Sequence, residues 1–269
     1  MVTKGNRIGS GRTAEVWEWG EGKVLKQFKP GFDRGMIEWE YKMAKDVFEA
    51  GVPSPQVYEL LETDEGMGIV FARVEGECLL DKLQKSPWVL KKAARTMAQL
   101  HARMHRSTAV GLPEQRVNLA GRIQDSETVT GLDLQPFLRY AEQLPVGQAI
   151  CHGDFHPGNI MESNGEWMVL DWTTAETGHP GFDVARTLLL LRSPFRPPGM
   201  PAMVMKLSGW FNGIMEKTYV KEYRKLTGMT LSEMEEWLPV VAAARLRERV
   251  PGEREWLTAL LNHWRKQLG

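Results

Sequence analysis

The segment 149–171 constrains the fold of this chain most strongly, because short apolar stretches and a polar loop interrupt a half that otherwise has helical patterning. Two short strands are predicted at 149–151 and 167–170, and Asn164-Gly165 is typical of a turn that joins strands. Between the strands lies Cys151-His-Gly-Asp-Phe-His-Pro-Gly-Asn159, with the spacing H-x-D-x-x-x-x-N. This arrangement predicts a polar loop that small strands hold inside a helical framework.

The first 75 or so residues have a different pattern, since β-favouring residues dominate and a single helix is predicted. Strands are predicted at 14–19, 23–28, 56–61 and 69–74. Asp33 is a favourable N-cap for a helix whose apolar residues recur at helical spacing until Gly51. This part of the chain is therefore expected to form a small, mostly antiparallel sheet with one main helix.

From about residue 76 helices dominate. Ser86-Pro87 predicts the start of a long helix that ends near His105, since serine caps helices and proline is tolerated at the first helical position. Later helices are predicted at 182–192 and 202–226, from a capping box at Ser232 and Glu235, and from 253 onward. The fold class is predicted to be α+β, with strands predominating at 1–75 and helices at 76–269.

Composition excludes several classes of protein. The chain has 34 basic and 34 acidic side chains, so its net charge gives no default attraction to nucleic acid or to an anionic membrane. Its two cysteines, Cys78 and Cys151, cannot form a disulfide framework, which is typical of a reducing compartment, although one bridge stays open. No apolar run approaches the roughly 18 residues of a spanning helix. We therefore expect a cytoplasmic protein without a nucleic-acid or membrane partner.

A glycine-bearing segment at 9–16 fits the pattern G-x-G-x-x-A-x-V through Gly9, Ser10 and Gly11. It joins strands and does not open a helix, whereas a dinucleotide fingerprint needs a helix directly after its glycines. Glycines let backbone N–H groups approach phosphate oxygens without a Cβ in the way. A flexible hairpin over phosphates and an ordinary turn are both compatible with this segment.

Lys26 lies in the predicted strand 23–28, and Glu40 lies on the apolar stripe of the helix that follows. A carboxylate on that stripe needs a partner, because an unpaired charge beside a hydrophobic core is strongly unfavourable. A cation from the adjoining sheet supplies one, and Lys26 is the natural candidate. The alternative is that Glu40 lies at the edge of the stripe and reaches water.

The loop supplies the side chains that phosphoryl transfer to a hydroxyl requires. Asp154 offers a carboxylate that can orient an acceptor hydroxyl and take its proton, and Asn159 offers an oxygen ligand for Mg²⁺. Asp171 follows the strand 167–170 with a second carboxylate, suited to a metal that bridges phosphate oxygens. These oxygen ligands match the preference of a hard cation.

Two histidine groupings suggest metal sites and are better explained in other ways. His152, His156 and Cys151 lack the paired ligand spacing of zinc sites. His101 and His105 are four residues apart on one predicted helix, but the glutamate of H-E-x-x-H and a third ligand are missing. Packing or surface positions are predicted for the second pair.

Taken together, these residues resemble the aminoglycoside phosphotransferase superfamily, small-molecule kinases that are related to choline kinases and have a protein-kinase-like fold. The resemblance covers nearly the whole chain and is carried by Gly9-x-Gly11, Lys26, Glu40, His152-Gly-Asp154 through Asn159, Asp171, and Gly181-Phe-Asp183. One departure is Ala14, which stands where many protein kinases have a third glycine and leaves the path of the glycine loop open. The resemblance implies a bilobal fold: a small antiparallel lobe with one main helix at 1–75 that binds nucleotide, and a larger, mostly helical lobe at 76–269 for catalysis and acceptor binding.

The resemblance further implies ATP as phosphate donor and Mg²⁺ as cofactor, with the adenine edge against the backbone of a linker near Ala72 to Val74. The family's functional positions then fall on the nucleotide-binding Gly9, Ser10, Gly11, Lys26, Glu40, Ala72 and Val74, the base Asp154, the metal ligands Asn159 and Asp171, and the supporting residues His152 and Asp183. In this assignment Lys26 contacts the α- and β-phosphates and pairs with Glu40. Asp183 braces the catalytic loop and does not touch substrate.

Two alternatives to a small-molecule kinase stay open: a protein serine/threonine kinase, and a nucleotide-binding pseudokinase scaffold without turnover. Only eleven residues separate Asp171 from Asp183 and no A-P-E motif follows, which leaves little room for an activation segment. Every residue that the reaction needs is present, which disfavours the scaffold. A small-molecule phosphotransferase is therefore favoured.

The acceptor is expected to be a small molecule with a hydroxyl group. Positions 192–269 hold 13 basic and 8 acidic side chains, a net charge of plus five. A polycationic aminoglycoside would prefer an acidic cleft. The count favours sugars, amino alcohols, nucleoside-like metabolites or anionic acceptors, unless the arginines are simply solvated.

Overall fold

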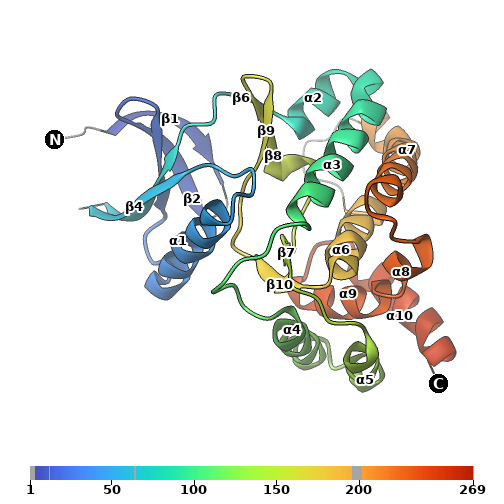
Figure 1. Cartoon of the computed structure of the whole chain (residues 1–269). Helices are drawn as coiled ribbons and strands as arrows, with labels where there is room; N and C mark the ends of the chain where they lie inside the picture. Colours follow the sequence, from blue (N-terminus) through green and yellow to red (C-terminus); the bar gives the residue numbers. More distant parts are fainter. Residues whose placement is uncertain (1–3, 12, 64, 196–201, 269) are drawn as a thin grey trace.

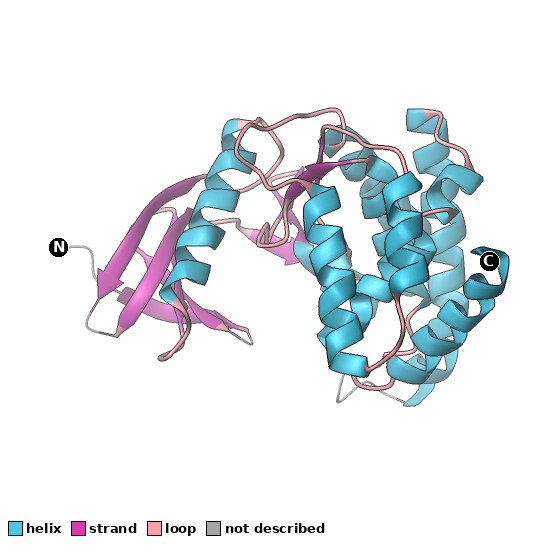
Figure 2. Ribbon diagram, turned by 90° about the horizontal axis from the view of Figure 1, so that it is seen from below, coloured by secondary structure: helices cyan, strands magenta, loops and turns pink. Residues whose placement is uncertain are grey.

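A computed structural model describes residues 4–11, 13–63, 65–195 and 202–268, which divide into a part built on a sheet and a part built on helices (Figure 1). The expected α+β fold class is confirmed, since an antiparallel N-terminal sheet precedes a mostly helical remainder. Figure 2 shows the sheet at one end of the molecule and most of the helices gathered at the other. Among the described residues, no helix combines the length and the apolar character that crossing a membrane requires.

The N-terminal sheet has five antiparallel strands in the spatial order β1-β2-β3-β5-β4. Their bounds are β1 Lys4–Ser10, β2 Ala14–Trp19, β3 Lys23–Phe28, β4 Val57–Thr63 and β5 Gly66–Ala72. Helix α1 (Arg34–Glu49) begins after Asp33, whose side chain accepts a hydrogen bond from the backbone N–H of Met36 at 2.9 Å. A small buried cluster joins this helix to the sheet and consists of Ala14, Phe28, Ile37 and Ile69. The helix therefore lies against one face of the sheet.

Short strands frame the polar loop in the second part of the chain. One small sheet has the order β6-β8-β9, and a second pairs β7 with β10. Their bounds are β6 Gly76–Cys78, β7 Ala149–Cys151, β8 Ile160–Ser163, β9 Glu166–Val169 and β10 Glu176–Gly178. Asn164 and Gly165 make the turn between β8 and β9 with φ of 52° and 83°, which explains why asparagine and glycine occupy it.

Helices enclose these strands and contribute one large apolar core. Their bounds are α2 Leu79–Lys85, α3 Leu90–Met104, α4 Gln115–Thr130, α5 Gln135–Gln143, α6 Pro180–Arg192, α7 Ala202–Thr227, α8 Leu231–Glu235, α9 Leu238–Arg245 and α10 Arg254–Leu268. Single 3₁₀ turns occupy Pro87–Val89, Pro157–Asn159 and Leu246–Glu248. Helices α3 and α7 lie side by side in parallel, since His101 contacts Tyr219 and His105 contacts Tyr223.

One local prediction is confirmed and another is wrong. The helix expected from Ser86-Pro87 begins as a 3₁₀ turn at Pro87–Val89 and continues as α3 to Met104, while Ser86, with φ −145° and ψ 93°, separates it from the preceding α2, because a proline pushes the residue before it out of the helical region. The capping box uses Thr230 and Glu233 in place of Ser232 and Glu235. The sequence Thr-Leu-Ser-Glu-Met-Glu contains two overlapping box patterns, and the first one starts the helix.

Candidate active site

Lys26 and Glu40 form an ion pair between the N-terminal sheet and helix α1. Lys26 lies on β3, opposite Val16 of β2 and Ile69 of β5, which fixes its side chain on the face that α1 covers. The Glu40 side chain is only 8% exposed, so it does not reach water at the edge of the helix. Burial raises the pKa of the Glu40 carboxyl, while the Lys26 ammonium opposes that shift.

Asp171 lies across from this pair, with a carboxylate oxygen 4.0 Å from the Lys26 ammonium. Its backbone has φ 62°, a left-handed conformation that is unusual for an aspartate, and its Oδ1 accepts a hydrogen bond from the Thr173 hydroxyl at 2.7 Å. Trp39 of α1 donates to the carbonyl of Thr173 at 3.2 Å and ties the helix to the same segment. The two parts of the chain therefore meet at Lys26 and Asp171.

His152 and Leu170 join the polar loop to the segment that carries Asp171. The Nε2–H of His152 donates to the carbonyl of Leu170 at 2.9 Å, while its Nδ1 accepts from the backbone N–H of Asp154 at 3.1 Å. The backbone N–H of Leu170 donates to the carbonyl of Asn159 at 2.8 Å. Asn159 closes the loop, since its Nδ2 donates to the carbonyl of Asp154 at 3.0 Å. These bonds place Asp154, Asn159 and Asp171 around one short stretch of backbone.

The carboxylate of Asp183 binds the backbone at the start of the loop. Asp183 is fully buried near the N-terminus of α6, and its carboxylate accepts hydrogen bonds from the backbone N–H groups of His152 at 2.6 Å and Gly153 at 2.8 Å. His101 and His105 donate to the same carboxylate at 3.0 and 3.3 Å. Burial opposes ionisation of Asp183, but these donors hold its pKa well below the usual value.

His101 and His105 are neither surface residues nor a free metal site. Each ring accepts at Nδ1 from a tyrosine hydroxyl at 2.6 Å, Tyr219 for His101 and Tyr223 for His105. Burial lowers the pKa of His101 to about 4, so the ring is neutral at pH 7. Their ring nitrogens and Asp183 are close enough to surround an ion, but the nitrogens on both rings and the carboxylate already have hydrogen-bond partners. The cluster is a hydrogen-bonded support for Asp183.

The side chain of Asp154 is 36% exposed, so its carboxylate is accessible to solvent. Arg186 donates to its Oδ1 at 3.4 Å, and the His156 ring lies 3.6 Å from Oδ2. Burial raises the pKa of Asp154, but the contacts with His156 and Arg186 outweigh burial and hold the pKa well below its ordinary value. Asp154 is therefore ionised at neutral pH and can accept a proton.

The glycine-bearing segment lies where strands β1 and β2 meet. Gly9 and Ser10 end β1 opposite Val16 and Glu15, and the N–H of Gly11 donates to the carbonyl of Ala14 at 2.8 Å. Position 12, inside the pattern, lies outside the described residues. The segment joins two strands as expected, but among the residues described no hydrogen bond or ion pair links it with Lys26 or Asp171.

The linker predicted near Ala72 and Val74 follows β5. The N–H of Ala72 donates to the carbonyl of Gln56 at 2.8 Å, and the N–H of Arg73 to that of Gly22 at 2.9 Å. Within the described part of the chain, the backbone of Val74 makes no hydrogen bond to another backbone group. The backbone N–H and C=O of Val74 are therefore available to form hydrogen bonds with the edge of a ligand.

Three supporting features escaped the sequence analysis. Arg186 contacts Asp154 directly, but the sequence does not show which residue an arginine within an apolar helix pattern will contact. Gly153 has φ 78°, and a Cβ there would lie 2.8 Å from the carbonyl oxygen of Thr174, so the close approach of two loops requires glycine. Trp39 cannot be recognised from the sequence, because an exposed tryptophan on a helix carries no position-specific signal.

The plus-five charge of positions 192–269 is not gathered around Asp154. Arg192 binds Glu216 and Glu235, and Arg245 is likewise paired with two carboxylates. A further four cations line a separate surface hollow of about 490 Å³ on α7, namely Lys217, Lys221, Arg224 and Lys225. The regional charge count therefore does not describe the surroundings of the loop carboxylate.

Comparison with known proteins agrees with this geometry. The family model described as the phosphotransferase enzyme family, abbreviated APH, matches residues 4–210, well over half of the chain. The chain belongs to this family. The resemblance noted from the sequence is thereby confirmed. No curated protein sequence gives a significant match.

Solved structures of the phosphotransferase family share the fold. An aminoglycoside-3'-phosphotransferase of type VIII has 18% identity and a TM-score of 0.61, over 92% of this chain and 93% of its own. A choline/ethanolamine kinase family protein from Mesorhizobium loti has 15% identity and a TM-score of 0.55, over 100% and 87%. An amicoumacin kinase in complex with AMP-PNP, Ca²⁺ and its ligand has 14% identity and a TM-score of 0.56, over 99% and 87%. At these identities the likeness concerns the fold, which is the bilobal kinase-like fold expected from the sequence.

Proposed function

We propose that this phosphotransferase moves the γ-phosphate of ATP to a hydroxyl group of a small molecule. The observation that carries the proposal is the 4.0 Å approach of Lys26, paired with buried Glu40, to Asp171, which follows β9 in a segment that is hydrogen-bonded to the loop bearing Asp154. Phosphoryl transfer depends on positioning and charge stabilisation, and these groups supply both. The amicoumacin kinase with AMP-PNP and Ca²⁺ supports a nucleotide and a divalent ion as ligands of this fold.

In this proposal the lobe 1–75 binds ATP and the lobe 76–269 carries the catalytic loop and the acceptor. The adenine edge would lie against the linker at Ala72 and Val74, where the backbone N–H and C=O of Val74 are available. The phosphates would lie under the turn at Gly9, Ser10 and Gly11, and the Lys26 ammonium would contact the α- and β-phosphates. Cytoplasmic location stays a prediction.

The donor set at Asn159 and Asp171 fits Mg²⁺. The Asn159 amide nitrogen is used in a hydrogen bond to the loop carbonyl, which leaves its Oδ1 for an ion, and the Asp171 side chain is half exposed. Both offer hard oxygen ligands, as Mg²⁺ on nucleotide phosphates requires. When bound, the ion would neutralise charge that develops on the phosphates.

Asp154 is proposed as the base that orients the acceptor hydroxyl and takes its proton. The side chain is ionised and partly open to solvent, and the loop that carries it is fixed by His152 and Asp183. These two residues act on the loop and are not placed to touch substrate. A protein serine/threonine kinase and a scaffold without turnover are the alternatives that the test must separate.

The test is ADP release in the presence of MgATP and a panel of acceptors: sugars, amino alcohols, nucleosides, aminoglycosides and one serine/threonine peptide. We expect at least one small hydroxyl compound to stimulate release, and Asp154→Asn to lower that rate by about 10²- to 10⁴-fold without weakening nucleotide binding. Asp125→Asn, at an exposed site paired with Arg247, is the matched control. Preference for the peptide would point to a protein kinase, and a flat response with intact nucleotide binding would point to the scaffold.

A further inference from the structure

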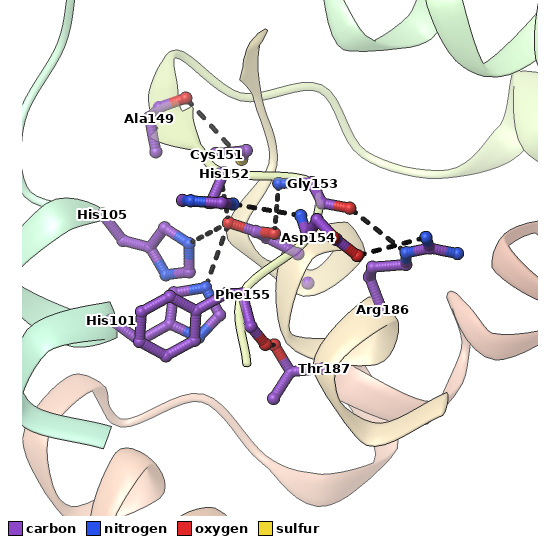
Figure 3. Close-up of polar contacts among 12 residues, drawn as sticks. His101, His105, Ala149, Cys151, His152, Gly153, Asp154, Phe155, Arg186 and Thr187 are labelled. Carbon is purple, nitrogen blue, oxygen red and sulfur yellow. Dashed lines mark hydrogen bonds and ion pairs between the residues drawn. The ribbon is translucent and has the colours of Figure 1, made fainter. Parts of the chain in front are cut away.

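Arg186 is a buried cation that faces the loop and has no place in the roles assigned above. It lies on α6, one turn beyond Asp183, and its residue is 8% exposed. Its Nε donates to the carbonyl of Gly153 at 3.1 Å, and its Nη2 donates to Oδ1 of Asp154 at 3.4 Å (Figure 3). One guanidinium therefore contacts both the backbone and the carboxylate at the base position.

The strongest partner of Arg186 comes from the C-terminal part of the chain. Oε1 of Glu248, in the turn after α9, lies 2.8 Å from the same Nη2. The other oxygen of Glu248 is held by Arg245 at 2.7 Å, and Arg245 also binds Glu253 through two nitrogens at 2.6 and 2.9 Å. These three residues lie beyond position 210, where the family match ends. Alternating charges thus run from a segment outside the matched region to Asp154.

Charge balance alone does not explain the contacts that Arg186 makes with the loop. A buried guanidinium needs an anionic partner, and Glu248 at 2.8 Å already supplies one. The contacts to Gly153 and Asp154 constrain the orientation of these two groups, because the guanidinium is planar and its donors have a fixed geometry. Among the described residues, Arg186 makes the shortest side-chain contact with the Asp154 carboxylate, at Oδ1, while the His156 ring lies 3.6 Å from Oδ2.

We propose that Arg186 is a positioning residue that fixes the carboxylate of Asp154 toward the acceptor, and that Glu248 fixes Arg186. This inference rests on the proposed function, since it assigns a purpose to the orientation of the base. Loss of the guanidinium leaves the nucleotide contacts of the opposite lobe intact but lets the carboxylate rotate. An error of about 1 Å in the position of a catalytic group costs about 10²-fold in rate.

The test compares Arg186→Met, Arg186→Lys, Glu248→Gln and the double variant Arg186→Met/Glu248→Gln with the wild type and Asp154→Asn. Methionine fills a similar volume. The carboxylates of Asp154 and Glu248, which lose their arginine partner in this variant, are about one-third exposed, so water can hydrate them. Arg192→Met is the matched control, because this arginine lies on the same helix and binds two carboxylates away from the loop. The readouts are kcat and KM for ADP release with MgATP, affinity for MgAMP-PNP by calorimetry, and crystal structures of the variants.

We expect Arg186→Met to lower kcat by about 10²-fold with nucleotide affinity within twofold, and Arg186→Lys to recover part of that loss. Glu248→Gln should have a smaller effect that disappears in the Arg186→Met background, and Arg192→Met should keep wild-type kcat. A kcat for Arg186→Met within threefold of wild type, while Asp154→Asn is inactive, would overturn the inference and leave the proposed function standing. If Asp154→Asn keeps wild-type turnover, the proposed function fails instead. If no acceptor gives turnover, the crystal structures decide: a side chain of Asp154 unmoved in Arg186→Met overturns the inference, and a rotated one supports it.

Discussion

Asp183→Asn is the substitution with the largest expected effect on the loop that bears Asp154. Asparagine keeps the size of the side chain, but it removes the charge and replaces one acceptor oxygen with an NH₂ group. In its better orientation the amide oxygen still meets the donors that contact Oδ2, namely His101, His105 and the N–H of His152. The N–H of Gly153 then faces the NH₂ group and loses its acceptor.

Two contributions set the size of the loss. An orphaned buried N–H costs about 1–3 kcal/mol, and three bonds that change from charged to neutral acceptors lose roughly 1 kcal/mol each. We therefore expect the free energy of unfolding to fall by about 4–6 kcal/mol, which corresponds to roughly 8–24 °C in Tm. Urea unfolding and calorimetry measure this directly. Asp125→Asn removes an exposed aspartate, 61% accessible, and should change stability by no more than about 0.5 kcal/mol. A loss below about 1 kcal/mol for Asp183→Asn would refute the view that this carboxylate organises the loop.

Three further predictions concern other parts of the site. Gly153→Ala should lower the free energy of unfolding by about 2 kcal/mol or more in urea titrations, because a Cβ there would lie 2.8 Å from a carbonyl oxygen. Gly165 also has a positive φ but has open space around it, so Gly165→Ala should lower the free energy of unfolding by only about 1 kcal/mol. Equal losses for the two variants would contradict this explanation. Burial lowers the pKa of His101 to about 4, against about 6.5 unfolded, so the unfolded state binds the proton first and stability should fall by about 3 kcal/mol as the pH drops from about 6.5 to 4. His101→Gln should show a shallower fall over that window, and an unchanged slope would speak against a neutral buried ring. Lys26→Ala should weaken MgATP binding at least tenfold in calorimetry while the exposed Lys85→Ala leaves it unchanged, and equal affinities for both variants would remove Lys26 from the nucleotide site.

The sequence predicted the candidate site better than its supports, and particular residues show why. Asp154 and Asn159 are five positions apart on one loop, so their association needs no knowledge of tertiary packing. The partnership of Lys26 and Glu40 followed from the cost of a buried carboxylate on an apolar stripe. In contrast, Asp183 meets His101 and His105 only because α3 and α6 pack around the loop, and no local pattern records that contact.

Several fold details depended on competition between nearly equal local signals. Thr230 and Ser232 both begin a capping-box pattern, and nothing in that pattern tells which of them starts the helix; in the structure Thr230 does. The three-residue strands β6 and β10 exist because other strands lie beside them, so their own composition does not predict them. Arg186 and Glu248 are 62 positions apart, and their contact arises only when the C-terminal turn after α9 folds against α6.

The most direct test of the proposed centre is the position of a divalent ion in crystals grown with Mn²⁺ and AMP-PNP. The proposal predicts an anomalous peak within ligand distance of Asn159 Oδ1 and the Asp171 carboxylate, with the Lys26 ammonium on the phosphates and Asp154 facing the γ-phosphate. A bound nucleotide whose ion lies away from both Asn159 and Asp171, or whose γ-phosphate points away from Asp154, would contradict it.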